Sequence, residues 1–152
     1  MRTLGIRVEP KQISFVVYCN NAKTLLCVDV ITIPKALEVP EQLKYVRNNV
    51  LDLLREYQVE RAALRVAEGI AKNQSIPRYY LEAVIQEAFS SSSVVMYHVL
   101  RMNSIMKRLG LNKVDYNLIL ESKSSINDID NSTFKKPMNE ALMASLAVVE
   151  NA

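Results

Sequence analysis

The chain is poor in the residue types that several common catalytic and binding sites require. Its 152 residues include three glycines, one histidine and two cysteines. Because Gly5, Gly69 and Gly110 stand far apart, neither a Walker loop nor a dinucleotide-binding fingerprint is possible. No Gly-x-Ser-x-Gly elbow is present, and His98 and the two cysteines have no metal-ligand spacing. These absences argue against a P-loop or Rossmann nucleotide site, a serine hydrolase and a structural zinc site.

The chain also lacks a long apolar run and a large excess of one charge. No apolar run approaches the roughly 20 residues of a membrane span, and Met1 leads almost directly into a predicted strand. We therefore expect no membrane association and no targeting peptide. Cys19 and Cys27 are expected to be buried thiols in a reducing cytoplasm, with a disulfide or a reactive thiol as the alternative. The net charge of +3 permits nucleic acid as a partner without requiring it.

The N-terminal third predicts a three-stranded antiparallel meander. Thr3–Val8, Ile13–Cys19 and Leu25–Ile33 are rich in apolar and β-branched residues. The short connections contain Pro10 and a pair of asparagines, which are common in turns. With 152 residues and a hydrophobic fraction of 49%, the chain has enough apolar material for one domain, 1–152, with its own core.

The remainder of the chain predicts helices that alternate with strands. A helix is expected from about Pro40 to Gln58, because apolar residues recur there at three- and four-residue steps. The further predicted elements are a buried strand Ala62–Ala67, a helix from about Ser75 to Phe89, a strand Val94–Val99, a short helix Met102–Leu109 and a last helix that opens at Pro137. Residues 111–136 predict an irregular surface segment, in which one helical turn near Val114–Leu120 is the element that the pattern allows. The order indicates an α/β protein, a mixed sheet with helices on both faces and right-handed crossovers.

This order and a few short motifs resemble a known superfamily. The first strand reads Leu-Gly-Ile-Arg at positions 4–7, and the last predicted helix is rich in alanine. The pattern resembles the ribonuclease H-like superfamily, in particular its Holliday-junction resolvase (RuvC-like) branch. The segments Tyr57–Arg61, Arg65–Glu68 and Leu81–Gln86 also resemble a small bacterial family of unknown function within that superfamily.

The resemblance implies a catalytic site of four carboxylates that hold two magnesium ions. The corresponding positions here are Arg7, Glu68, Glu140 and Met143, so one metal ligand has become a cation and another a thioether. Methionine is a poor ligand for hard cations such as magnesium. The resemblance therefore predicts the fold more directly than it predicts nuclease activity.

The substitution at position 7 suggests a structural hypothesis. A guanidinium can bridge carboxylates through bidentate hydrogen bonds, so Arg7 could replace the charge of the metal by pairing with Glu68 and Glu140. It would then hold the end of the first strand against the last helix, and Arg7→Ala would destabilise the fold. The alternative is that Arg7 is an exposed residue at a strand end, as most arginines are exposed.

Several basic and aromatic residues are expected at the same edge of the sheet, after the fourth and fifth strands. The candidate nucleic-acid contacts are Lys72, Arg78, Tyr79, Arg101, Lys107 and Arg108. Together they would form a surface that follows phosphates and stacks on bases. The alternative is a solvated basic rim. His98, also near this edge in the prediction, is more typical of a structural histidine than of a catalytic one.

These observations favour a noncatalytic (pseudo-nuclease) binding or scaffolding protein without a cofactor. DNA or RNA is the favoured ligand, and we expect a homodimer or a component of a larger complex. One alternative is a residual nuclease that uses Glu68 and Glu140 with Mg²⁺ or Mn²⁺, which the charge of Arg7 would oppose. A second alternative is a protein-interaction component that binds no nucleic acid. Steep weakening of binding with salt would indicate nucleic acid.

Overall fold

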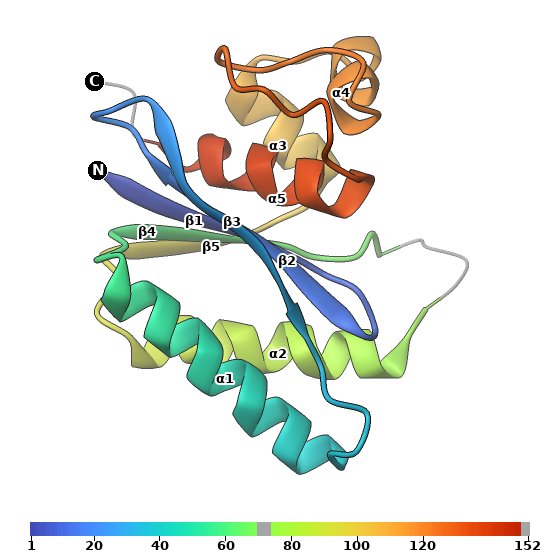
Figure 1. Cartoon of the computed structure of the whole chain (residues 1–152). Helices are drawn as coiled ribbons and strands as arrows, with labels where there is room; N and C mark the ends of the chain where they lie inside the picture. Colours follow the sequence, from blue (N-terminus) through green and yellow to red (C-terminus); the bar gives the residue numbers. More distant parts are fainter. Residues whose placement is uncertain (70–73, 150–152) are drawn as a thin grey trace.

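The computed structural model describes residues 1–69 and 74–149, and Figure 1 shows a mixed sheet between two layers of helices. The sheet has five strands in the order β3-β2-β1-β4-β5. The strands are β1 (Arg2–Val8), β2 (Gln12–Cys19), β3 (Thr24–Thr32), β4 (Arg61–Arg65) and β5 (Met96–Leu100). This arrangement confirms the α/β fold expected from the element order.

The first three strands form the expected antiparallel meander. β1 pairs with β2 and β2 pairs with β3 in antiparallel register. The first turn is closed by a hydrogen bond from the Glu9 nitrogen to the Gln12 carbonyl oxygen, at 2.9 Å. In the second turn Lys23 has a φ of 56°, a left-handed conformation typical of tight turns. β4 and β5 then extend the sheet in parallel with β1.

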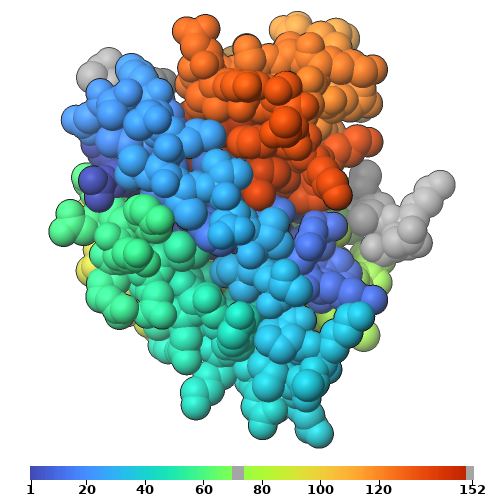
Figure 2. All heavy atoms as spheres, viewed as in Figure 1, coloured from blue at the N-terminus to red at the C-terminus, as the bar shows by residue number. Residues whose placement is uncertain are grey.

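The helices cover the two faces of the sheet unequally. α1 (Val39–Glu56) and α2 (Ile76–Ser91) lie on one face, whereas α3 (Met102–Leu109), α4 (Lys113–Leu120) and α5 (Lys136–Ala147) lie on the other (Figure 1). The Ser75 hydroxyl caps α2 by accepting a hydrogen bond from the Arg78 nitrogen. In the space-filling view, β3 crosses between the two helical layers as an uncovered edge (Figure 2). None of the helices in the described ranges is both long and apolar enough to cross a bilayer.

The alternation of side chains along β1 divides the core into two parts. Leu4, Ile6 and Val8 are buried in the larger cluster, which includes residues of α1 and α2. The residues between them face α5: the Thr3 hydroxyl donates to the Ser145 carbonyl oxygen at 2.8 Å, and Gly5 packs against the helix backbone. Because Arg7 continues this second set, it faces α5 as well.

Residues 111–136 are more ordered and more buried than the sequence predicts. α4 is a two-turn helix, capped by the Asn112 side chain, which accepts from the Asp115 nitrogen at 2.8 Å. Tyr116 and Ile119, three residues apart, are buried against α3 and α5. Asn131 is buried too, and its amide donates to Asn139 Oδ1 at 2.9 Å. The expectation of an irregular surface segment was wrong for this part, because two inward apolar positions are too few to show a helical period.

The close approach of α5 to β1 predicts a strong effect of Gly5→Ala. A Cβ at position 5 would overlap the carbonyl oxygen of Ala141 and lie 2.5 Å from the Ser145 nitrogen. Both atoms belong to the helix backbone and cannot turn away, so we expect the free energy of unfolding to fall by about 3 kcal/mol or more. Urea denaturation followed by circular dichroism measures this loss.

Gly69→Ala is the matched control, because a Cβ at position 69 meets nothing within 4 Å. We expect this control to change the free energy of unfolding by less than about 0.5 kcal/mol. Equal stabilities of the two variants would contradict the tight packing of α5 on β1.

Candidate functional site

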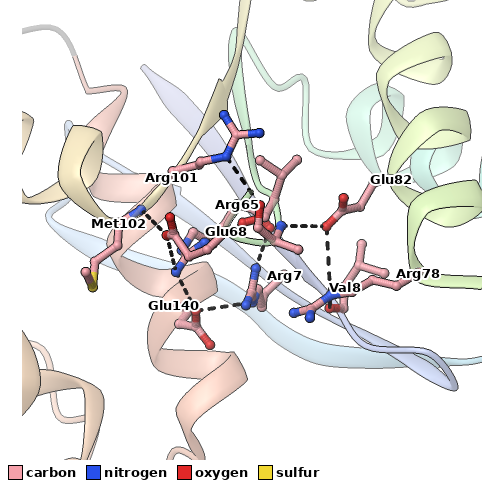
Figure 3. A network of polar contacts seen from close by, with 11 residues as sticks. Arg7, Val8, Arg65, Glu68, Arg78, Glu82, Arg101, Met102 and Glu140 are labelled. Carbon is pink, nitrogen blue, oxygen red and sulfur yellow. Dashed lines mark hydrogen bonds and ion pairs between the residues drawn. The ribbon is translucent and has the colours of Figure 1, made fainter. Parts of the chain in front are cut away.

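Two arginines meet near the carboxyl ends of neighbouring parallel strands. Arg7 lies near the end of β1, Arg65 is the last residue of β4, and the two are partners in the parallel register. Glu140 reaches them from α5, and Glu68 follows β4 by three residues (Figure 3). The parallel strands and the close packing of α5 therefore bring together four charged residues, Arg7, Arg65, Glu68 and Glu140, which we call the acid–arginine centre.

Two of the ion pairs in this centre share the Glu140 carboxylate, and two share the Arg65 guanidinium. Arg7 Nε lies 3.2 Å from Glu140 Oε2, and Arg65 Nη2 lies 3.4 Å from the same oxygen. Arg65 Nη2 also lies 3.1 Å from Glu68 Oε1. The side chains of Arg7, Arg65 and Glu140 are only 11%, 5% and 12% exposed, whereas Glu68 is 36% exposed. Glu140 thus serves two buried cations, and Arg65 links the two acids.

Hydrogen bonds to the backbone extend the centre across the sheet edge. Arg7 Nη1 donates to the Arg65 carbonyl oxygen at 3.1 Å, and Arg65 Nη1 donates to the Val66 carbonyl oxygen. Glu68 Oε1 accepts from the Met102 nitrogen at 3.0 Å. Since Met102 begins α3, the centre connects β1, β4, α3 and α5.

A second layer of charges lies beside the centre, toward α2. Glu82 is buried and accepts from the Ala67 nitrogen at 2.9 Å. Arg78 Nε donates to the Val8 carbonyl oxygen at 3.0 Å and lies 3.9 Å from Glu82 Oε2. Arg101 Nε donates to the Ala67 carbonyl oxygen at 3.3 Å (Figure 3). These bonds fix the end of β1 and the chain that leaves β4.

Burial of the charges is electrostatically unfavourable at this centre. It lowers the pKa of Arg7 to about 10, an effect larger than the opposing attraction of Glu140, and the neighbouring Arg65 lowers it further. Arg7 remains protonated at neutral pH, so its charge is kept in spite of the desolvation. Burial also raises the pKa of Tyr116, which lies close to Arg65. Among the described residues, Arg65 Nε and the Tyr116 hydroxyl are buried without a hydrogen-bond partner.

The four positions implied by the resemblance are brought together only in part. Arg7 pairs with Glu140 as the hypothesis requires, and it is buried rather than exposed at a strand end. In the described part of the chain, however, Arg7 makes no ion pair with Glu68; Arg65 provides that link. Met143 is fully buried in the apolar cluster beneath α3 and α5. Sequence reasoning missed Arg65, although a charged residue within the apolar run Ala62–Ala67 was a usable signal.

The predicted nucleic-acid residues do not share one edge of the sheet. Arg78 and Arg101 lie beside the acid–arginine centre, and Tyr79 is exposed. Arg108, in contrast, lines a cavity together with Tyr18, which pairs with Thr3 at the opposite edge. The prediction that Arg108 borders the site was wrong, because α3 runs back along the sheet from Met102 to Leu109. Lys107 lies in the last turn of α3 and is exposed.

Two further sequence predictions concern Lys72 and His98. Lys72 lies outside the described residues. His98 is half-buried on β5, with Nδ1 3.4 Å from Arg108 Nη2. Burial lowers the pKa of His98, and the charge of Arg108 lowers it further. A neutral ring beside an arginine is consistent with the structural role expected for this histidine.

The acid–arginine centre does not fit a magnesium ion. Magnesium prefers six oxygen ligands in octahedral geometry. Here both carboxylates are engaged by Arg65, and Arg7 brings a second positive charge to the same oxygen of Glu140. Within residues 1–69 and 74–149, no group of three or more His, Cys, Asp or Glu residues is arranged to hold a metal ion. The charge that a metal would supply is carried by guanidinium groups.

A groove lies beside the centre on the α5 face of the sheet. Its volume is about 670 Å³, and its walls come from β2, β3 and the start of α5. The lining includes Ser14, which is the register partner of Arg7, and Met138, which precedes Glu140 by two residues. Val28 and Val30 provide an apolar floor, and Phe134 and Lys135 form part of the opposite wall. The groove therefore borders the acid–arginine centre.

Comparison with known proteins identifies the fold. No family model matches the chain, and no curated protein sequence matches it. Among solved structures, the RuvC of Thermus thermophilus superposes with a TM-score of 0.76 at 16% identity, covering 97% of this chain and 92% of that one. The T. thermophilus RuvC in complex with a Holliday junction substrate gives 0.74 at 14% identity, with coverages of 97% and 91%.

The yeast mitochondrial Holliday junction resolvase Ydc2 is also similar, with a TM-score of 0.56 at 12% identity and coverages of 95% and 77%. The chain therefore has a ribonuclease H-like fold of the RuvC type, as the strand order and the first-strand residues predicted. At these identities the likeness concerns the fold.

The shared carboxylate predicts that Glu140→Gln destabilises the protein strongly. The substitution leaves two buried guanidinium groups near each other without the acid that serves both. Removing one member of a buried ion pair typically costs about 3–5 kcal/mol, and we expect a loss of that size in urea denaturation at neutral pH.

Glu121→Gln is the matched control, because Glu121 pairs with Lys123 at 3.1 Å but both side chains are well exposed. It should cost no more than about 1 kcal/mol. Adding Arg7→Met to Glu140→Gln should recover part of the loss, since it removes one of the two like charges. A Glu140→Gln variant as stable as the control would contradict the network.

Proposed function

We propose that this chain is a noncatalytic nucleic-acid-binding protein of RuvC-like fold, in which the acid–arginine centre takes the structural place of a metal site. The observation that carries the proposal is the sharing of Glu140 between Arg7 and Arg65. Arg7 stands at the position of a metal ligand in the resemblance, and Arg65 is its neighbour in the parallel register. An ion-paired centre of this kind can hold strands and helix together without divalent ions.

The charge balance supports this replacement. The resemblance implies four carboxylates and two magnesium ions, whose charges cancel. Here Arg7, Arg65, Arg78 and Arg101 carry four positive charges against three negative charges on Glu68, Glu82 and Glu140. A net charge of about +1 at the sheet edge remains compatible with a phosphodiester nearby.

The same residues lack the means to activate water. A bound metal ion creates a nucleophile by lowering the pKa of a water ligand, which a guanidinium does not do. Glu68 and Glu140 are both occupied by arginine, and Glu68 also accepts the Met102 hydrogen bond. One oxygen of each acid is thus held by arginine, which disfavours its use as a general base. The centre can therefore attract phosphate without hydrolysing it.

The exposed groups around the centre suggest how nucleic acid would bind. Arg101 is exposed, and its Nε donates a hydrogen bond to the Ala67 carbonyl oxygen. Its two terminal nitrogens point away from that bond (Figure 3). Tyr79 and Tyr80 are exposed at the start of α2 and can stack on bases. Because a RuvC with this fold has been solved with a Holliday junction substrate, branched DNA is the first ligand to test.

Self-association is part of the proposal. β5 is an edge strand of the sheet and exposes Val95, Met96, Tyr97 and Val99 on and beside it. Exposed apolar residues on a strand edge favour pairing with another chain. We propose a homodimer, alone or within a larger complex, and sedimentation velocity at several protein concentrations would measure it.

Binding to four-way junction, duplex and single-stranded DNA, and to RNA, tests the proposed function. The purified protein is assayed with and without Mg²⁺ or Mn²⁺, and both retention and cleavage are scored. We expect retention that weakens steeply with salt, and no cleavage with either metal. Arg101→Gln should weaken binding. It should also reduce the slope of log affinity against log salt concentration by about 0.9 for each lost phosphate contact.

Arg55→Gln is the matched control for Arg101→Gln, because Arg55 is exposed on α1 and, within the described residues, pairs only with Asp52. Metal-dependent cleavage abolished by Glu68→Gln would overturn the noncatalytic proposal and favour a residual nuclease. No binding to any nucleic acid would instead favour a protein-interaction role.

A further inference from the structure

A second group of cations lies at the opposite edge of the sheet, around a cavity of about 380 Å³. Four separate segments form its walls: the end of β2 with the following turn, the end of α3, the end of α5 and the loop before α5. The lining residues are Tyr18, Asn20, Lys23, Arg108, Leu109, Asn127, Leu146, Ala147 and Val149. Figure 1 shows the β2–β3 turn close to the C-terminal end of α5. We call this cavity the amino-edge pocket.

The charge of the amino-edge pocket is positive. Lys23 and Arg108 line it, and its lining among the described residues contains no aspartate or glutamate. Two helices, α3 and α5, end at its wall, and each helix C-terminus contributes roughly half a negative charge. These two ends together offset about one of the two side-chain charges, so about one positive charge remains. The cations therefore exceed what the helix ends require.

The pocket also offers hydrogen-bond donors that the rest of the structure leaves largely unused. Arg108 Nη2 lies 3.4 Å from His98 Nδ1, a contact that uses one of its five N–H groups. Lys23 Nζ donates to Asn20 Oδ1 at 3.3 Å, and this bond does not use the amide NH₂ of Asn20. In the part of the chain that the structure describes, the Asn127 side chain makes no hydrogen bond. Tyr18, only 2% exposed, adds a phenol to the wall.

Two of these residues lie in turns with a left-handed backbone. Lys23 and Asn127 have φ values of 56° and 53°, in the left-handed region that L residues adopt only at a cost. Each lies in a turn whose neighbours are hydrogen-bonded: the Asn20 nitrogen donates to the Met1 carbonyl oxygen, and the Ile129 nitrogen donates to the Ile126 carbonyl oxygen. The turns thus fix the backbone at two residues of the pocket wall before any ligand arrives.

We propose that the amino-edge pocket binds a phosphoryl group. An arginine fork, an ammonium, two amides and a phenol supply more donors than a carboxylate with two oxygens accepts, and they suit the three or four acceptor oxygens of a phosphate. The volume leaves room for the atoms attached to that group. The site is separate from the acid–arginine centre and does not depend on the proposed function. The phosphoryl group comes either from a free nucleotide or from a nucleic-acid backbone.

Titration of the protein with inorganic phosphate, followed by backbone and side-chain amide NMR signals, tests the proposal. We expect saturable shifts of the Asn20 and Asn127 side-chain signals, with the signals of α1 unchanged. Lys23→Gln and Arg108→Gln should each weaken the affinity about tenfold, the size expected for loss of one charge-assisted hydrogen bond. Lys23→Gln keeps an L residue at the left-handed position, so it does not change the backbone requirement.

Lys44→Gln is the matched control, because Lys44 is exposed on α1 and the substitution changes the net charge equally. An affinity for phosphate that is the same in all three variants, or no saturable shift at Asn20 and Asn127, would overturn the proposal. The test is independent of Arg101 and of nucleic-acid binding at the other edge.

Two further probes identify the source of the phosphoryl group. If a nucleotide supplies it, adenosine 5′-monophosphate should bind more tightly than inorganic phosphate and lose affinity in Arg108→Gln, with DNA affinity unchanged. If a backbone supplies it, Arg108→Gln should weaken the binding of a short DNA duplex and lower its salt slope by about 0.9. Either result would support a phosphoryl site in the amino-edge pocket. If inorganic phosphate, adenosine 5′-monophosphate and the duplex all fail to bind there, the proposal is wrong.

Discussion

The carboxylate of Glu140, shared by two buried guanidinium groups, is the interaction on which this edge of the structure depends. It joins β1, β4 and α5 at one point. Buried ion pairs are costly, because desolvation of the charges can exceed their attraction, as the lowered pKa of Arg7 indicates. The network is therefore better understood as a device that fixes geometry than as a source of stability. The close contact of Gly5 with α5 sets the distance at which Glu140 can reach both arginines.

In the proposed function, arginines replace the metal-bound carboxylates that the resemblance implies, and the fold persists without them. Four carboxylates at a sheet edge would repel one another unless cations lay between them. Arginine at positions 7 and 65 supplies those cations from within the chain, so the strands and α5 keep their relative positions. The cost is chemical: a guanidinium neutralises charge and can contact phosphate, but it provides no activated water.

The sequence predicted the fold well and the site incompletely, for reasons that lie in particular residues. Apolar periodicity and turn residues located the meander and the alternating elements, and Gly5 with Arg7 marked the edge of the first strand. Arg65 was missed, because its pairing with Arg7 depends on the parallel register of β1 and β4, which no local pattern encodes. The prediction placed Arg108 at the wrong edge of the sheet. α3 runs back along the sheet from Met102, so Arg108 lies at the opposite edge. The order of α4 depends on Tyr116 and Asn131, whose partners are distant in sequence.

The most direct test of the central claim is whether Mn²⁺ has a site at the acid–arginine centre. Paramagnetic Mn²⁺ selectively broadens the NMR signals of nearby nuclei, so a titration would report binding residue by residue. The account predicts no selective broadening of the amide signals at residues 66–68 and 139–141, because Arg7 and Arg65 occupy the acids. Saturable broadening confined to those residues, and absent from a Glu68→Gln variant, would show that the acids hold a metal and would contradict the account.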